Sequence, residues 1–383
     1  MRTLVINALR LSGKRTAIGR HIEYLAQKWS RMSVPFTRIV LLSPREMYLT
    51  DLGSITLIEL QTLPTAMPNL YWEQVVLPRA ARGSAMLFSE YTRPLAYRGR
   101  TVVANHGIYE STPRAFSWWS RLRAVPMYKY SALRADRVIA NSRSTKEDLI
   151  NHLTVDAGKI DVVYPGPADI FFEPHPVDSI KNEVVRVLGQ DTPFIIFVGK
   201  LARRRHVPNL MEAFALVRQK LNLPHHLLLV GPNVEDQPLA EIAARHGISA
   251  CFKHLPHLDQ PELARLYAAA DLFVLPTTYE GISWTMFEAM ASGTAVLTVD
   301  HPALREGAFE AVLALPSPSV DDLVKGLSTL LGNGAARTEL ERKGTEVVKR
   351  FSLQEGARQT MEILDRYAAR ADGTRRGGPV FPT

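Results

Sequence analysis

Short runs of apolar residues alternate along this chain with longer stretches of helical periodicity. The apolar runs predict strands over residues 3–9, 36–42, 55–60, 85–88, 101–105, 137–141 and 159–164, then over 194–199, 226–231, 248–253, 271–276 and 294–299. Most of these runs are continuously apolar. Strands of that kind are buried on both faces, as in parallel sheets covered by helices. The pattern therefore predicts an α/β fold made of two doubly wound, Rossmann-like sheets.

A proline-rich segment separates the two series of strands. "YPGPADIFFEPHPVD" (164–178) has four prolines and no helical period, which indicates a linker. We predict an N-terminal domain over residues 1–170 and a C-terminal domain over 171–350. Residues 351–370 are predicted to form an amphipathic helix that packs back on the N-terminal domain, and 371–383 a disordered tail. In such a pair of domains, a ligand is expected in the cleft at the carboxyl ends of the strands.

The composition indicates the cellular compartment of the protein more clearly than its function. Hydrophobic residues make up 46% and charged residues 22%, as in ordinary globular proteins. No uncharged apolar stretch approaches the roughly 20 residues that a membrane-spanning helix needs. The first apolar run is interpreted as a buried strand and not as a signal peptide. The single cysteine, Cys251, excludes an intramolecular disulfide and fits a reducing compartment, so we expect a cytoplasmic protein.

The excess of basic residues predicts anionic partners. The formal net charge is +8, from 46 Lys and Arg against 38 Asp and Glu. Nucleotides and phosphorylated substrates fit this charge, whereas a nucleic-acid partner would rest on charge alone and is not expected. Residues 111–134 place Trp118 and Trp119 close to several basic residues, so peripheral association with an anionic membrane is an alternative to a helix inside the acceptor domain. The oligomeric state stays open.

The segment "PTTYEGISWTMFEAMASG" (276–293) places two glutamates at a strand-to-helix corner. Its G-x-S-x-T letters approach the nucleophile elbow of serine hydrolases, but Thr285 stands where that elbow needs a small residue. The one histidine after Ser283 is His301, eighteen residues on, which leaves no room for the intervening strands. A hydrolase is therefore excluded.

A helix N-terminus at this corner favours an anion instead. Gly281 would let a phosphate approach the backbone closely. Glu280 in the loop suits the hydroxyls of a sugar, and Glu288 in the helix suits a vicinal diol such as that of ribose. Taken alone, the two glutamates could equally be solvated.

A second strand-to-helix corner carries basic residues. In "FVGKLARRRHVPNLMEAF" (197–214), Lys200 and Arg203–Arg205 follow a strand and precede an amphipathic helix, which suits a diphosphate. A solvated basic turn is the alternative. The loop over residues 9–26 resembles a phosphate-binding Walker A loop, but Ala8 and Arg15 break that motif, so an NTPase is not expected. No G-x-G-x-x-G motif is present, which removes the dinucleotide-dependent dehydrogenases, and no Asp-x-Asp or metal-ligand spacing predicts a metal.

Together these segments resemble the family-4 retaining glycosyltransferases of GT-B fold. The resemblance covers nearly the whole chain and is strongest over residues 197–217, 227–233, 262–300 and 302–315. It implies that the N-terminal domain, 1–170, binds the acceptor and that the C-terminal domain, 171–350, binds the donor. It implies that Lys200 and Arg205 bind the leaving diphosphate, that Glu280 lies near the donor sugar, and that Glu288 binds the ribose. It further implies an acceptor-side histidine at His106. The donor-binding residues that it adds are Gly19, Gly199, Gly281, Ile282, Ser283, Trp284 and Thr285.

Three features depart from the family pattern. Ile282 and Ser283 follow Gly281 where the family usually has Phe and Gly. The usual Arg and Lys appear as Lys200 and Arg205, which keeps the charge but changes the donor geometry. Ala17 stands where a glycine is expected. These departures concern how the sugar and phosphate are held.

The activity that the resemblance implies is transfer of a hexose with retention of configuration. The donor would be a nucleotide-diphosphate sugar of the GDP-mannose or UDP-sugar type, and the acceptor a hydroxyl of a glycan, a lipid-linked sugar or a small molecule. Such enzymes belong to bacterial polysaccharide or glycolipid biosynthesis, and no metal or other cofactor is expected. A nucleotide-sugar epimerase of the same fold is the alternative.

Overall fold

The computed structural model describes residues 2–13, 17–49, 57–63, 67–108, 118–306 and 308–369, which form two compact units. Unit 1 comprises the described residues up to Tyr164 together with those from Gln354 onwards. Unit 2 comprises the described residues between Pro165 and Leu353. The predicted boundary at residue 170 stays a prediction, and the predicted tail 371–383 lies outside the described residues.

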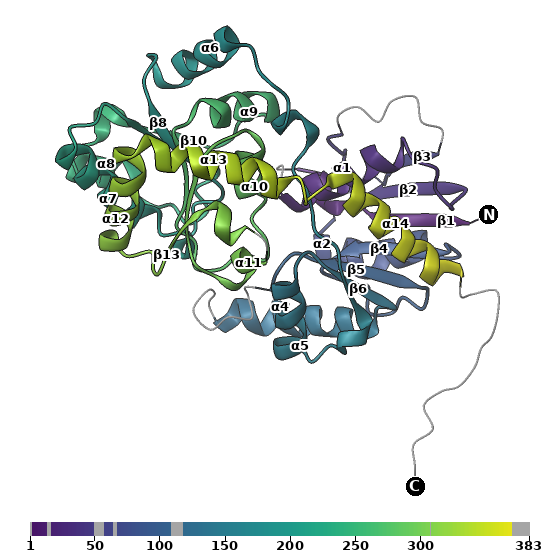
Figure 1. Cartoon of the computed structure of the whole chain (residues 1–383). Helices are drawn as coiled ribbons and strands as arrows, with labels where there is room; N and C mark the ends of the chain where they lie inside the picture. The colour runs from purple at the N-terminus through teal and green to yellow at the C-terminus, as the bar shows by residue number, and fades with distance from the viewer. Residues whose placement is uncertain are drawn as a thin grey trace. The chain divides into compact units, whose positions relative to one another are not determined.

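Unit 1 contains a seven-stranded parallel sheet in the order β3-β2-β1-β4-β5-β6-β7 (Figure 1). Its strands are β1 (Thr3–Asn7), β2 (Arg38–Ser43), β3 (Ile58–Thr62), β4 (Met86–Glu90), β5 (Thr101–Asn105), β6 (Arg137–Ala140) and β7 (Ile160–Val162). Its α-helices are α1 (Ala17–Trp29), α2 (Asn69–Tyr71), α3 (Leu77–Ala80), α4 (Trp118–Arg134), α5 (Arg143–Leu153) and α14 (Leu353–Ala369). A short 3₁₀ helix, η1 (Leu9–Leu11), follows β1, and a π-helical turn, η2 (Trp72–Val76), joins α2 to α3.

Both faces of this sheet are buried, which explains the continuously apolar strands. In β1, Leu4 and Ile6 belong to a core shared with helices α1 and α14, while Val5 between them belongs to a second core with Trp72. Since successive side chains of a strand point to opposite faces, each face has its own helical cover. The α/β prediction is confirmed for this unit.

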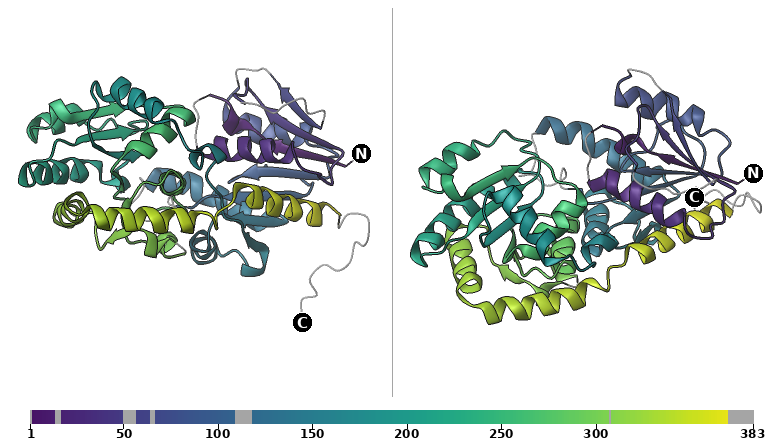
Figure 2. Two further views of the ribbon diagram at one scale, coloured as in Figure 1. Left: turned by 45° about the horizontal axis from the view of Figure 1, so that its top comes forward. Right: turned by 90° about the horizontal axis from the view of Figure 1, so that it is seen from above.

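Unit 2 contains a six-stranded parallel sheet in the order β10-β9-β8-β11-β12-β13. The strands are β8 (Phe194–Val198), β9 (His226–Val230), β10 (Phe252–Leu255), β11 (Leu272–Leu275), β12 (Val296–Val299) and β13 (Leu313–Leu315). The α-helices are α6 (Val177–Leu188), α7 (Val207–Lys220), α8 (Leu239–Arg245), α9 (Gln260–Ala269), α10 (Trp284–Ala291), α11 (Pro302–Arg305), α12 (Val320–Gly332) and α13 (Gly334–Val348). Figure 2 shows these helices layered around the sheet.

Each sheet has a point at which the strand order reverses. In unit 1 it lies between β1 and β4, and in unit 2 between β8 and β11. From β1 the chain continues to β2 towards one edge of the sheet, whereas from β4 it continues to β5 towards the opposite edge. The chain diverges in the same way after β8 and after β11. In open α/β sheets, ligands bind outside the carboxyl ends of the strands at such a switch point. The candidate site is therefore expected in the loops that follow these four strands.

Three local predictions need correction. The strand predicted over 248–253 begins only at Phe252, because Ser249–Cys251 form a 3₁₀ helix. Strand β13 was not predicted, since its three residues are too short to show a pattern. The loop predicted over 9–26 is helical from Ala17 onwards.

The C-terminal helix packs on unit 1. Helix α14 contributes Ala357, Met361 and Leu364 to the core of that unit, and the indole nitrogen of Trp29 donates a hydrogen bond to the Ala357 carbonyl at 2.9 Å. This apolar stripe at helical spacing is the amphipathic pattern of residues 351–370.

The membrane hypothesis rests on a segment that the structure describes only in part. Residues 111–117 lie outside the described residues, and helix α4 begins at Trp118. Among the described residues, no helix has both the length and the apolar character of a membrane span.

Candidate functional site

Strand β8 ends in a glycine whose missing side chain makes room for an arginine. Gly199 has φ +149°, a backbone conformation that favours glycine. A Cβ built on Gly199 would lie 1.5 Å from Nη1 of Arg205. The guanidinium of Arg205 thus lies against the end of β8, and Lys200 follows Gly199 with an exposed side chain.

Two arginines from the turn after β8 contact the glutamate from the loop after β11. The 3₁₀ helix η6 (Arg203–Arg205) precedes α7. Oε1 of Glu280 lies 2.9 Å from Nη1 of Arg204 and 2.8 Å from Nη2 of Arg205. The hydroxyl of Thr277 donates to the same oxygen at 3.2 Å. The structure therefore brings together two predicted residues, Arg205 and Glu280, at the switch point of unit 2. We call Arg204, Arg205 and Glu280 the arginine–glutamate corner.

Burial and charge determine the ionisation of Glu280. Its side chain is 9% exposed, and burial by itself would raise its pKa. The positive charges of Arg204 and Arg205 outweigh burial, so the pKa of Glu280 is lowered and the carboxylate is ionised near neutral pH. Two cations and one anion leave the corner with net positive charge, to which the adjacent Lys200 adds. The corner thus suits an anionic ligand that carries more than one charge.

Replacing Glu280 by glutamine is expected to lower stability by about 1–3 kcal/mol at pH 7, because two partly buried guanidinium groups lose their anion. A carboxyl group whose pKa is lowered by folding stabilises the protein above its unfolded pKa and loses that effect as pH falls through the folded pKa. The difference between wild type and Glu280→Gln should therefore persist from pH 7 to about pH 5 and narrow below about pH 4.5 in urea unfolding. As a control, Glu59→Gln breaks a surface pair with Arg38 and should change little. A pH-independent difference would contradict this electrostatic explanation.

The N-terminus of α10 carries the remaining donor-site predictions of this loop. Ser283 is the N-cap, and its hydroxyl accepts a hydrogen bond from the Met286 amide at 3.3 Å. Gly281, Ile282 and Ser283 are buried, whereas Trp284 and Thr285 begin the helix half-buried. Ser283 therefore stabilises the helix start where the family pattern has glycine. Glu288 is 2% exposed in the same helix, and its contact with a ribose stays a prediction.

The sequence did not predict two further residues at this corner. Arg204 was treated only as part of a basic run, yet its guanidinium contacts Glu280. His301 follows β12 and is 5% exposed, and neither ring nitrogen has a hydrogen-bond partner among the described residues. Burial lowers the pKa of His301, while the negative charges of Glu280 and Asp300 act to raise it. The sequence clue to His301 was its position just after β12, the strand that pairs with β11.

In unit 1, the predicted His106 contacts a buried glutamate. His106 follows β5, and its Nε2 lies 2.6 Å from Oε2 of Glu90, the last residue of β4. The other oxygen, Oε1, lies 2.9 Å from Nδ1 of His21 in helix α1. Neither Glu90 nor His21 was among the predicted site residues. The available signal was the acidic residue at the end of the buried strand β4.

One donor atom from each of His21, Glu90 and His106 lies within 4.8 Å of the others, so the residue types and spacing would permit a metal ion. Two ligands of one tetrahedral zinc ion, each about 2.0 Å from it, would lie roughly 3.3 Å apart. The carboxylate–imidazole distances of 2.6 and 2.9 Å are shorter and correspond to direct hydrogen bonds. We treat the three residues as a hydrogen-bonded triad.

Gly19 lies in the first turn of α1, whereas the resemblance placed it in a phosphate-facing loop. A Cβ at Gly19 would lie 2.3 Å from the Arg10 carbonyl oxygen and 2.5 Å from the Tyr48 hydroxyl. The glycine is thus required for close packing of α1 against the turn after β1. Residues 14–16, which precede this helix, lie outside the described residues.

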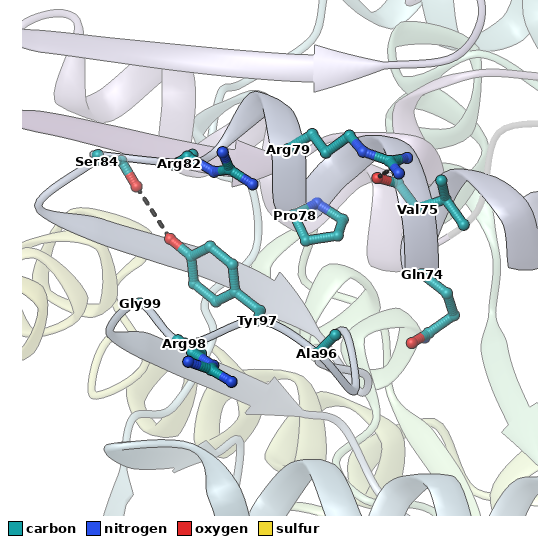
Figure 3. Close-up of a pocket in the computed structure, with 11 residues that line it drawn as sticks. Gln74, Val75, Pro78, Arg79, Arg82, Ser84, Ala96, Tyr97, Arg98 and Gly99 are labelled. Atoms are coloured by element: carbon teal, nitrogen blue, oxygen red, sulfur yellow. Dashed lines mark hydrogen bonds between the residues drawn. The ribbon is translucent and has the colours of Figure 1, made fainter.

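A pocket of about 510 Å³ lies elsewhere in unit 1 (Figure 3). It is lined by Arg79, Arg82, Arg98 and the ring of Tyr97, whose hydroxyl lies 3.2 Å from the Ser84 hydroxyl. Residues 82–84 precede β4 and residues 96–99 precede β5. The pocket is therefore at the amino ends of these strands, whereas Glu90 and His106 are at the carboxyl ends. It is separate from the candidate site of this unit.

Comparison with known proteins decides the family. The model of glycosyltransferase family 4 matches residues 18–167, and that of glycosyl transferases group 1 matches residues 179–347. The first match covers every strand of the unit 1 sheet except β1, and the second covers all six strands of the unit 2 sheet. The chain belongs to the family-4 glycosyltransferases of GT-B fold. The residues matched by the group 1 model include the arginine–glutamate corner, and those matched by the family 4 model include the triad.

Curated and solved relatives agree with this family. The D-inositol 3-phosphate glycosyltransferase of Nocardia farcinica is 30% identical over 245 residues, which cover 61% of this chain and 53% of that protein. The match thus spans about half the length of that relative. Sucrose-phosphate synthase from Thermosynechococcus elongatus has the same fold, with a TM-score of 0.78, 17% identity, and coverage of 97% of this chain and 100% of that one. HepE from Anabaena, solved in complex with UDP-glucose, also has this fold. Its TM-score is 0.75 and its sequence identity 17%, with coverage of 96% of this chain and 100% of that one.

Proposed function

We propose that this protein transfers a hexose from a nucleotide-diphosphate sugar to a hydroxyl acceptor, with retention at the anomeric carbon. The observation that carries this proposal is the arginine–glutamate corner at the switch point of unit 2. Its net positive charge suits the diphosphate of such a donor, and its carboxylate suits sugar hydroxyls. The Anabaena protein in complex with UDP-glucose supports a donor of this class, because it shares the fold.

Different residues of unit 2 would bind different parts of the donor. Arg205 and Lys200 would neutralise the diphosphate, together with the backbone amides that begin α10 at Trp284 and Thr285. Glu280 would accept hydrogen bonds from the hexose, and Glu288 from the ribose. Because Glu280 also contacts Arg204 and Arg205, it would hold both guanidinium groups in place before the donor binds.

Catalysis would rest on positioning and on stabilisation of the leaving group. The acceptor hydroxyl attacks the anomeric carbon from the face that the diphosphate leaves, and the departing phosphate oxygen takes the hydroxyl proton. The C–O bond to the diphosphate breaks as the new glycosidic bond forms, which retains the configuration. The cations of the corner would stabilise the charge that develops on the diphosphate. No step requires a metal ion, and EDTA is expected to leave the rate unchanged.

Incubation with single nucleotide-sugars, with and without an acceptor, tests the proposal. D-inositol 3-phosphate is the first acceptor to try, because a relative is named D-inositol 3-phosphate glycosyltransferase. We expect release of nucleoside diphosphate that depends on the acceptor, and a product whose anomeric proton shows the donor's configuration. A donor epimerised without acceptor would instead indicate the alternative, an epimerase of the same fold. An inverted product would contradict retention.

We further propose a cytoplasmic enzyme of bacterial polysaccharide or glycolipid biosynthesis whose acceptor is a glycan, a lipid-linked sugar or a small molecule. Peripheral association of residues 111–134 with the inner face of the plasma membrane fits a lipid-linked acceptor. Its support is the cluster of aromatic and basic residues in the sequence. Sedimentation that is the same with neutral and with anionic liposomes would reject this association.

A further inference from the structure

A buried carboxylate in unit 1 joins two histidines from different parts of the chain. Glu90 is 4% exposed at the end of β4 and contacts both imidazoles, one through each oxygen. The two rings meet edge to face, with their centroids 4.7 Å apart. The side chains of His21 and His106 are 12% and 11% exposed, so all three residues are largely shielded from solvent.

The triad occupies the switch point of the unit 1 sheet. Glu90 ends β4, which pairs with β1 where the strand order reverses, and His21 lies in the helix that follows β1. His106 follows β5, the neighbour of β4. All three residues therefore lie at the carboxyl ends of the strands, where a ligand of an open α/β sheet binds.

The chemistry of the carboxylate sets the protons of both rings. Burial by itself would raise the pKa of Glu90, but its interactions with the two imidazoles outweigh burial, and the pKa is lowered. An ionised carboxylate only accepts hydrogen bonds, so the ring nitrogen that faces each oxygen must donate. In a neutral His106, the proton is then on Nε2 and the lone pair on Nδ1. In His21 the proton is on Nδ1, and burial lowers the pKa of this ring, which keeps it neutral.

We infer that Glu90 and His21 are positioning residues that hold His106 in one orientation and one tautomer. His106 can then accept a hydrogen bond from a substrate hydroxyl through Nδ1 alone. His21 fills the second oxygen of Glu90 and so prevents the carboxylate from turning away from His106. This inference rests on the proposed function, together with the predicted place of His106 on the acceptor side of the reaction.

The variant Glu90→Gln tests the inference because it keeps the shape and removes one of the two acceptors. An amide can accept from one imidazole only and must donate to the other, so one ring has to change its tautomer. Imidazole ¹⁵N spectra should show His106 protonated on Nε2 in the wild type, and an altered or mixed tautomer at His106 or His21 in the variant. The His106→Gln and His21→Gln variants assign the signals. This measurement needs no substrate, so it decides the inference even where no transfer activity is found.

Kinetics provide the second readout. We expect Glu90→Gln to lower kcat on the order of 10²-fold, because a small misplacement of a group near the reacting atoms costs about that much, with the KM for the donor nearly unchanged. Glu73→Gln is the matched control, because Glu73 is also a shielded carboxylate of unit 1 but accepts from the Thr92 hydroxyl. It should leave both constants within about twofold.

Three outcomes would overturn the inference. The first is an unchanged pair of tautomers in Glu90→Gln, and the second is an equal loss of kcat in Glu73→Gln. The third is stoichiometric zinc binding in calorimetry that is lost in His21→Gln, since a metal site would replace the hydrogen-bonded triad. If Glu90→Gln does not fold, His21→Gln provides the test, with a smaller loss of kcat expected because the contact between Glu90 and His106 remains.

Discussion

Replacing Arg205 by alanine is expected to lower kcat by about 10²-fold or more at saturating donor, as when one group that stabilises transition-state charge is removed. Arg205 is 11% exposed and lies 2.8 Å from Glu280, so its charge is poorly screened by solvent. Initial rates of nucleoside-diphosphate release, measured over a range of donor concentrations, check this prediction. Because the remaining Arg204 still contacts Glu280, we expect the variant to fold.

Arg203 offers the matched control, since it belongs to the same 3₁₀ turn. Its side chain is 95% exposed and reaches Glu235 only at 3.5 Å. Arg203→Ala removes the same formal charge from the same turn and should leave kcat within about twofold, because a solvated charge is strongly screened. Equal losses in both variants would indicate a general effect of net charge. Unchanged turnover in Arg205→Ala would end the assignment of this residue to the leaving diphosphate.

Gly199→Ala is expected to disable the site by displacing the guanidinium of Arg205. The new Cβ would lie 1.5 Å from Nη1 and 2.8 Å from Cζ of Arg205, so the guanidinium must leave its position beside Glu280. The backbone conformation at φ +149° also adds strain on the order of 1–3 kcal/mol. We expect a loss of kcat about as large as in Arg205→Ala, together with a lower melting temperature.

Gly189→Ala is the control that separates the effect of displacing Arg205 from the effect of backbone strain. Gly189 ends helix α6 at φ +82°, and a Cβ there would meet nothing within 4 Å. This variant should lose about 1 kcal/mol of stability and keep its turnover. The double variant Gly199→Ala with Arg205→Ala gives a further check, because two changes that act through one side chain are not additive. A double variant much slower than either single variant would contradict the displacement of Arg205.

The sequence predicted the fold well because strands that are buried on both faces are continuously apolar. A strand such as Phe194–Val198 is apolar at every position, which occurs when helices cover both sides of a sheet. Short or irregular elements leave no such trace. Strand β13 has only three residues. The 3₁₀ turn Ser249–Cys251 lies between the apolar residues Ile248 and Phe252, which gave this run the pattern of a strand.

The site was predicted where chemistry depends on residue type and was missed where it depends on contact. Glu280 was found because it lies at a strand-to-helix corner, and the resemblance singled out Arg205 from the basic run Arg203–Arg205. Arg204 and Glu90 were missed, since nothing in the sequence shows which of three adjacent arginines meets Glu280 or that the end of β4 meets two histidines. Gly199 was found by resemblance, but its physical reason, the space for Arg205, appeared only in three dimensions.

The central claim is that the arginine–glutamate corner binds the diphosphate of a nucleotide-sugar. Calorimetric titration of the wild type, Arg203→Ala and Arg205→Ala with UDP and with GDP tests it most directly. The account predicts that one of these nucleotides binds the wild type and Arg203→Ala with equal affinity at one site per chain, and that Arg205→Ala binds it at least about tenfold more weakly. Equal affinity in all three proteins, or no binding of either nucleotide to the wild type, would contradict it.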